Sequence, residues 1–133
     1  MKLITYTDGG ARGNPGPAAA GIVVKNEDGE VLASFGLYLG NQTNNFAEYT
    51  ALLEALKKAK ELGATEVDCV LDSELVVKQM RGEYKVKEPT LQKLFVQVYN
   101  KAQQFKKVTY RHVLRHLNKE ADKEVNKALD ENV

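Results

Sequence analysis

The start of the chain alternates between two sets of side chains in the way that a strand does. Over residues 2–8, Leu3, Thr5 and Thr7 share one face, and Asp8 lies on the opposite face at the end of the pattern. Comparable patterns predict two more strands, over residues 18–25 and about 30–39. The turn between them contains an Asp-Gly pair, which is typical of a hairpin. We therefore expect an antiparallel meander of three strands.

After residue 45 the apolar positions recur at helical spacing. They predict a helix from about Phe46 to Leu62, with Gly63 at its C-terminal end. The apolar run Glu66–Leu71 predicts a buried parallel strand. The later elements are expected as a short helix from Asp72-Ser73 to about Met80, a helix over about 89–104, a strand over 108–114 and a final helix that Asn118 caps and that ends near Glu131.

These elements follow the order βββαβααβα and form one α/β domain, residues 1–133. A hairpin-rich start that leads into strand–helix–strand units predicts a five-stranded mixed sheet. We expect strands one to three to be antiparallel, strands one, four and five to be parallel, and helices to cover both faces. The connecting segments 9–17, with four glycines, and 40–45, which is polar, are expected to be loops.

The composition excludes several classes of protein. With 43% hydrophobic and 28% charged residues, the chain has enough apolar side chains for a core and does not read as disordered. Its apolar runs are far too short for membrane spans, and Met1 leads directly into a strand without a signal peptide. We therefore expect a cytoplasmic protein with no membrane partner. Cys69 is a single cysteine in an apolar strand, so it is expected to be buried and inert.

Positive charge is concentrated in one part of the chain, although the net charge is only +1. Residues 75–119 contain eight Lys and three Arg but only two Glu and no Asp. Such an asymmetry is typical of a surface that binds a polyanion such as a nucleic acid. The alternative is that several of these lysines simply solvate helix faces.

Four acidic residues lie where a strand or loop meets a helix: Asp8, Glu48, Asp72 and Asp122. Each has an ordinary structural interpretation. Asp8 is suited to begin a turn, Glu48 to close a capping box that starts at Asn45, Asp72 to cap a helix, and Asp122 to complement a helix dipole.

Taken together, the four acids favour a metal site. If strands one and four are parallel neighbours, Asp8 and Asp72 lie side by side at the sheet edge where α/β proteins commonly bind ligands. Several carboxylates crowd into a small volume only with a cation, because their repulsion raises their pKa values. Oxygen ligands without a His or Cys cluster suit Mg²⁺ or Mn²⁺. Two such ions about 4 Å apart would support an in-line displacement at phosphorus.

Four sequence blocks together resemble type 1 ribonuclease H. They are Thr7-Asp8-Gly9-Gly10-Ala11-Arg12-Gly13-Asn14-Pro15-Gly16-Pro17, Thr43-Asn44-Asn45 with Ala47-Glu48-Tyr49 and Ala51, Leu71-Asp72-Ser73, and Asn118-Lys119-Glu120-Ala121-Asp122. The resemblance implies a ribonuclease H-like fold and endonucleolytic cleavage of the RNA strand of an RNA–DNA hybrid, leaving 5′-phosphate and 3′-hydroxyl ends. It assigns Asp8, Glu48, Asp72 and Asp122 as ligands of two Mg²⁺ ions, for which Mn²⁺ can substitute.

The same resemblance assigns substrate contacts. The residues it implies for binding the hybrid are Gly9, Gly10, Asn14, Thr43, Asn44, Asn45 and Gln79. Turn and capping roles are the alternative for the asparagines. His116 is a candidate for proton transfer or product release, whereas His112 is expected to pack. Larger relatives carry an extra basic helix and loop that this chain lacks, and Lys85 and Lys87 are expected to replace part of that grip through phosphate contacts.

Two other kinds of function remain open. One is a nuclease of the same fold that acts on another duplex, such as double-stranded RNA; the short length and the Asn-rich loop argue against strand transfer of the integrase type. The other is an inactive nucleic-acid-binding module, which the presence of all four acids does not favour. Whatever its function, we expect the protein to be a monomer.

Overall fold

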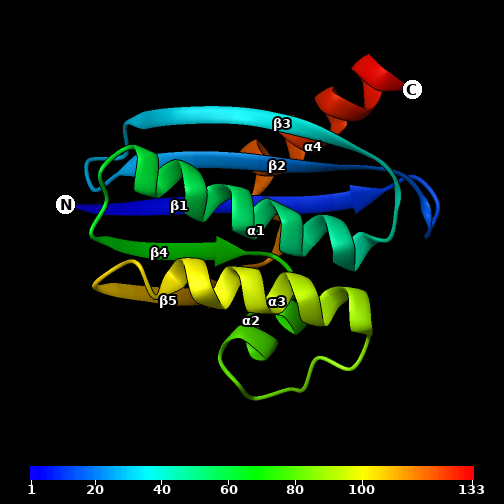
Figure 1. Ribbon diagram of the computed structural model, residues 1–133. Coiled ribbons are helices and arrows are strands. Elements are labelled where there is room, and N and C mark those ends of the chain that lie inside the picture. Colours follow the sequence, from blue (N-terminus) through cyan, green and yellow to red (C-terminus); the bar gives the residue numbers. More distant parts are fainter.

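The computed structural model describes residues 1–133 and contains one five-stranded mixed sheet in the order β3-β2-β1-β4-β5 (Figure 1). The strands are β1 (Lys2–Ala11), β2 (Gly16–Asn26), β3 (Val31–Gln42), β4 (Glu66–Leu71) and β5 (Lys107–His112). β1, β2 and β3 form an antiparallel meander, and β4 lies parallel to both β1 and β5. The predicted topology is therefore confirmed.

The helices are α1 (Asn44–Glu61), α2 (Glu74–Met80), α3 (Pro89–Ala102) and α4 (Lys119–Asn132), with a short 3₁₀ turn, η1 (Arg115–Leu117), before α4. Figure 1 shows α1 and α3 in front of the sheet and α4 behind β2 and β3, so both faces are covered as expected. The basic segment, residues 75–119, forms nearly all of α2 and the whole of α3, β5 and η1. Figure 1 shows α2, α3 and β5 together at one side of the fold. No helix is both long and apolar enough to span a membrane.

The main core lies between α1 and the sheet. Tyr49, Leu52 and Leu56 of α1 are fully buried, as are Leu3 of β1 and Ile22 of β2. Removing such side chains from water is the principal stabilising term in a domain of this size. Cys69 belongs to this core, so the expectation of a buried cysteine is confirmed, and its burial raises the pKa of the thiol to about 12.

β1 is longer than the alternating pattern predicts. Gly9, Gly10 and Ala11 continue the strand because they pair with β2 up to the couple Ala11↔Ala18. The expected glycine-rich loop is therefore shorter, and Asp8 lies inside the strand rather than at its end. Its pairing with β4 nevertheless stops at Thr7↔Leu71. Asp8 consequently lies just beyond the last parallel pair, level with Asp72.

The N-termini of α1 and α2 correct two structural interpretations. α1 starts after Thr43, whose hydroxyl accepts a hydrogen bond from the Phe46 N–H, so Asn45 is not the cap and Glu48 does not close a capping box. α2 starts after Ser73, whose Oγ accepts from the Val76 N–H, so Asp72 is not the cap either. Both acids are therefore left without the capping role that was their alternative.

Candidate metal and nucleic-acid site

Three carboxylates converge at the end of the parallel strand pair. Asp8 comes from β1, Glu48 from the second turn of α1, and Asp72 from the residue after β4. One oxygen of each lies within 4.8 Å of the others. They line a pocket of about 430 Å³ whose other residues are Gly9, Gly10, Ala11, Asn44, Asn45, Ser73 and Arg115. Asp8 and Glu48 are each only 6% exposed, which is unusual for acidic residues without a partner charge.

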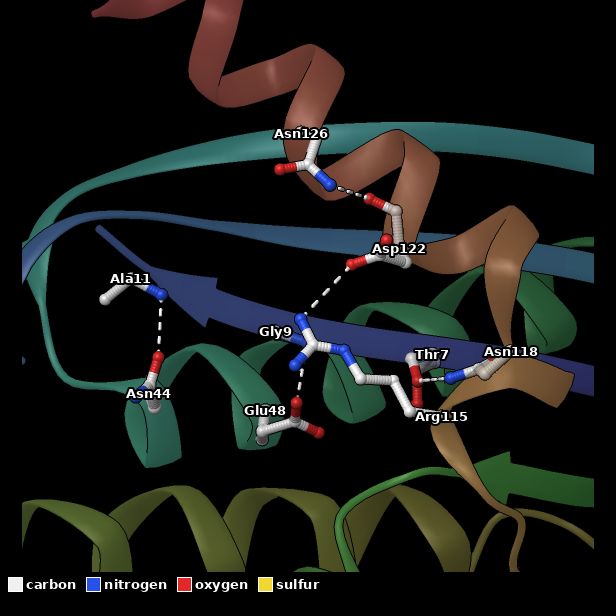
Figure 2. A network of polar contacts seen from close by, with 9 residues as sticks. All are labelled: Thr7, Gly9, Ala11, Asn44, Glu48, Arg115, Asn118, Asp122 and Asn126. Atoms are coloured by element: carbon white, nitrogen blue, oxygen red, sulfur yellow. Dashed lines mark hydrogen bonds and ion pairs between the residues drawn. The ribbon is translucent and has the colours of Figure 1, made fainter. Parts of the chain in front are cut away.

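A close approach between β1 and α1 holds Glu48 in place. The Gly9 N–H donates to Glu48 Oε1 over 2.8 Å, as Figure 2 shows. A Cβ atom on Gly9 would lie 2.3 Å from the backbone of Ala47 and Glu48, so only glycine fits at this point. The second oxygen, Glu48 Oε2, is buried without a hydrogen-bond partner. A buried oxygen without a partner is unusual in proteins and is suited to bind an ion or a water molecule.

The electrostatics of the pocket oppose full ionisation of these acids. Burial raises the pKa of Asp8 to about 7, and the nearby charge of Asp72 adds to the effect. Burial and then the charge of Asp8 hold the pKa of Glu48 well above its ordinary value. Burial also raises the pKa of Asp72, although the neighbouring Asn118 amide and the charge of Arg115 partly offset it. A bound cation would reverse these shifts, and the all-oxygen donor set fits a hard divalent ion.

Asp122 approaches the site from the opposite face of the sheet. It lies in the first turn of α4 and is not part of the three-acid cluster. Its charge is nevertheless close enough to raise the pKa of Asp8. Asp122 Oδ1 is 3.7 Å from an Arg115 nitrogen, as the dashed line in Figure 2 marks. The structure thus brings three of the four expected acids together and leaves the fourth at the margin of the cluster.

Asn118 has a role that the sequence did not suggest. It precedes α4 as expected, but its side chain makes no capping bond. Instead, its buried amide donates to the Thr7 carbonyl over 2.7 Å (Figure 2). This bond fastens the start of α4 to β1 directly beside Asp8, so it positions the helix that carries Asp122. The sequence around Asn118 predicts an ordinary helix cap and gives no sign of a bond to β1.

Arg115 occupies the place where a histidine was expected. It is the one basic residue that lines the acidic pocket. His116 does not line this pocket; it borders a separate hollow of about 250 Å³ together with Tyr6 and Lys25. The 3₁₀ turn of η1 directs these two neighbours to different hollows, so the structure does not bring His116 to the acids.

Asparagine oxygens tie the start of α1 to the end of β1 and to the loop that follows β1. Asn44 Oδ1 accepts from the Ala11 N–H over 2.7 Å, and Asn14 Oδ1 accepts from the Asn44 N–H over 3.0 Å. Figure 2 shows the first of these bonds. Because both oxygens are used inside the protein, the amide nitrogens remain as donors for a ligand. These bonds give Asn14 and Asn44 structural roles inside the protein, and Asn45 lines the pocket beside them.

The remaining expected contacts lie outside the pocket. Gln79 is buried, accepts from the Tyr49 hydroxyl over 2.6 Å and donates to the Lys85 carbonyl over 3.2 Å. Its side chain thus fastens the connector between α2 and α3 to the core and does not reach the acids. Lys85 and Lys87 are exposed on that connector.

Known proteins are similar to this chain in both sequence and fold. A model of the family described as reverse transcriptase-like matches residues 6–128. Bifunctional protein Rv2228c of Mycobacterium tuberculosis is 48% identical over 131 residues, which cover 98% of this chain and 36% of that protein. Ribonuclease HI of Halobacterium salinarum is 40% identical over 130 residues, which cover 98% of this chain and 65% of that protein.

Solved structures agree with these matches. The N-terminal ribonuclease H domain of Rv2228c superposes with a TM-score of 0.95 at 47% identity, covering 98% of this chain and 100% of that one. LC11-RNase H1, solved in complex with an RNA/DNA hybrid, gives a TM-score of 0.93 at 44% identity, covering 97% of each chain. The chain spans about a third of the length of the mycobacterial relatives that it matches.

Proposed function

The chain belongs to the reverse transcriptase-like family as a domain of the type 1 ribonuclease H kind, and from this premise we propose that it hydrolyses the RNA strand of RNA–DNA hybrids. The products would be 5′-phosphate and 3′-hydroxyl ends. The observation that carries the proposal is the convergence of Asp8, Glu48 and Asp72 beside the Asn44–Asn45 turn. Relatives of similar length and fold include an RNase H1 that was crystallised with an RNA/DNA hybrid.

Asp8, Glu48 and Asp72, with Asp122 at the margin, would hold two Mg²⁺ ions, and Mn²⁺ would substitute. The unpartnered Glu48 Oε2 and the raised pKa of Asp8 support this assignment, since both are relieved by a cation. When bound, such ions supply a nucleophilic water at neutral pH and stabilise the negative charge at phosphorus. The Gly9 N–H holds Glu48 and the Asn118 amide holds α4, so the protein keeps its ligand oxygens in place before the substrate arrives.

The substrate would be recognised by donors on the rim of the pocket. The free amide nitrogens of Asn14 and Asn44 are suited to donate to phosphate oxygens and 2′-hydroxyls, with Thr43 and Asn45 beside them. Gly9 and Gly10 line the same pocket and would present backbone to the nucleic acid, while the missing Cβ of Gly9 is explained by the approach of α1. Lys85 and Lys87 would contact phosphates of the other strand without reading its sequence. Gln79 supports their connector, and His116 has no part in this arrangement.

We also infer a monomer that works in the cytoplasm. The acids of the pocket all come from one chain, and the single thiol is buried in the core. A molecular mass measured by light scattering, with and without hybrid, tests the oligomeric state.

Labelled duplexes distinguish the proposed activity from its alternatives. We expect cleavage of the RNA strand of an RNA–DNA hybrid in the presence of Mg²⁺ or Mn²⁺, and none after addition of a chelator. Cleavage of RNA–RNA duplex at a comparable rate would instead make the protein a broader duplex ribonuclease. Binding to hybrid without any cleavage in either metal would contradict the proposal and favour an inactive binding module.

Replacing Asn44 or Asn45 with Ala is expected to weaken discrimination for hybrid. The preference for RNA–DNA over DNA–DNA in binding should fall about 5- to 30-fold, because a lost hydrogen bond to a 2′-hydroxyl or phosphate is worth roughly 1–2 kcal/mol. Competition binding with both duplexes measures the ratio. The Asn44 variant should also lose some thermal stability, since it removes the bond to the Ala11 N–H. An unchanged ratio in both variants would leave these residues with structural roles alone.

A further inference from the structure

The acidic pocket contains its own positive charge. Arg115 is its only basic lining residue, and its side chain is 82% exposed. Figure 2 shows the side chain extended across the site, with the guanidinium directed toward Asp122. At 3.7 Å this ion pair is loose compared with the 2.6 Å pair between Arg12 and Asp130. An exposed, loosely held guanidinium exchanges partners easily.

The surrounding carboxylates explain why the guanidinium of Arg115 is held there. Three carboxylates lie with oxygens within 4.8 Å of one another, and Asp122 stands at their margin. The charge of Arg115 also lowers the pKa of Asp72, so it acts on the cluster and not only on Asp122. Two divalent ions would supply four positive charges to the same small volume. The guanidinium would then be repelled by the ions, and Asp122 would be drawn toward them.

We propose that Arg115 is a resident counter-ion of this pocket, which pairs with Asp122 before metal ions bind and turns to a phosphate of the substrate once they are bound. The inference rests on the proposed function: both halves need the metal site, and the second half also needs the hybrid substrate. The planar guanidinium, with its fork of donors, is well suited to a phosphate. Its place on η1, which directly precedes the helix that carries Asp122, couples the two residues through a short stretch of backbone.

Metal binding in the absence of nucleic acid tests the first half. We expect Arg115→Gln to bind Mg²⁺ about two- to fivefold more tightly by titration calorimetry, because the ion no longer has to displace the guanidinium from an exposed ion pair. Arg115→Lys, which keeps the charge, should bind Mg²⁺ like the wild type. Arg111→Gln is the matched control, since Arg111 pairs with Asp68 outside the pocket. Equal or weaker Mg²⁺ binding by Arg115→Gln would overturn the counter-ion role.

Cleavage of hybrid at saturating Mg²⁺ tests the second half. We expect kcat of Arg115→Gln to fall at least tenfold, with partial recovery in Arg115→Lys and no change in Arg111→Gln. Tighter Mg²⁺ binding with an unchanged kcat would overturn the phosphate contact.

The two proposals fail in different ways. A wild-type protein that binds Mg²⁺ but cuts no hybrid contradicts the proposed function and the phosphate contact, while the calorimetry still decides the counter-ion role. A wild-type protein that binds no Mg²⁺ overturns both proposals together.

Discussion

Replacing Asp8 with Asn is expected to lower the rate of hybrid cleavage at least about a thousandfold while the fold is retained. Asp8 lies close to all three of the other acids, because Asp72, Glu48 and Asp122 each influence its pKa. Losing one ligand carboxylate weakens charge stabilisation that is worth several kcal/mol, and each 1.4 kcal/mol is about tenfold in rate. Single-turnover cleavage at saturating Mg²⁺ measures the effect. Wild-type turnover in the variant would contradict the assignment of Asp8 to the reaction.

The same variant should be more stable than the wild type when no metal is present, and the difference should depend on pH. The pKa of Asp8 is about 7 in the folded protein, against an ordinary value of 3.8. The folded wild type therefore binds a proton more tightly than the unfolded chain, so it loses stability as pH rises from about 4 through about 7. The amide that replaces the carboxyl group in Asp8→Asn does not titrate. We expect the stability gain to be near zero at pH 4 and up to about 4 kcal/mol at pH 8.

Denaturant unfolding in the presence of a chelator, at several pH values, measures this difference. An excess of Mg²⁺ should reduce or reverse it at pH 8, because ions that bind the folded wild type stabilise it by mass action. A stability gain that is equal at pH 4 and pH 8 would show that repulsion among the acids is not its source.

Replacing Gly9 with Ala is expected to damage both stability and activity. The added Cβ would lie 2.3 Å from the backbone of Ala47 and Glu48, and backbone atoms cannot rotate away as a side-chain tip can. α1 would have to move outward, and the Gly9–Glu48 hydrogen bond would stretch. We expect the free energy of unfolding to fall by about 2–3 kcal/mol and the rate of hybrid cleavage to fall at least tenfold.

Gly10→Ala is the matched control for stability. A Cβ at Gly10 would meet only Val125 Cγ1 at 3.5 Å, which is an ordinary contact. The control should unfold within about 0.5 kcal/mol of the wild type, as is typical for a substitution without a clash. Equal stabilities of the two alanine variants, measured by urea unfolding, would contradict the close approach of α1 to β1.

The positions of Asp8 and Asp72 could be anticipated because they depend on topology. Once β1 and β4 are parallel neighbours, residues that follow their last pair lie side by side, whatever the details of the loops. The length of β1 could not be anticipated in the same way. Gly9 and Gly10 have little intrinsic preference for a strand, and they become one only because they pair with Ala19 and Ala20 of β2. Tertiary pairing decided what the local pattern left open.

The sequence pattern also could not show which of several neighbouring residues takes a given role. Thr43, Asn44 and Asn45 are all good helix caps, and only the Thr43–Phe46 hydrogen bond shows which one begins α1. Arg115 and His116 raise the same difficulty for chemistry. Histidine is the more familiar proton carrier, and the resemblance to type 1 ribonuclease H made His116 the candidate. The backbone of η1 decides which of these two adjacent side chains enters the pocket. A sequence pattern cannot predict the orientation of so short a turn.

The connector between α2 and α3 is attached to the fold away from the acidic pocket. It is fastened to the core through the Gln79–Lys85 bond, and its residues do not line the acidic pocket. If Lys85 and Lys87 contact phosphates as proposed, a longer or more basic segment at this place is expected to change how firmly nucleic acid is held without moving a ligand oxygen. We therefore expect that exchanging this one surface loop alters the affinity for hybrid and leaves the rate of cleavage at saturating hybrid unchanged.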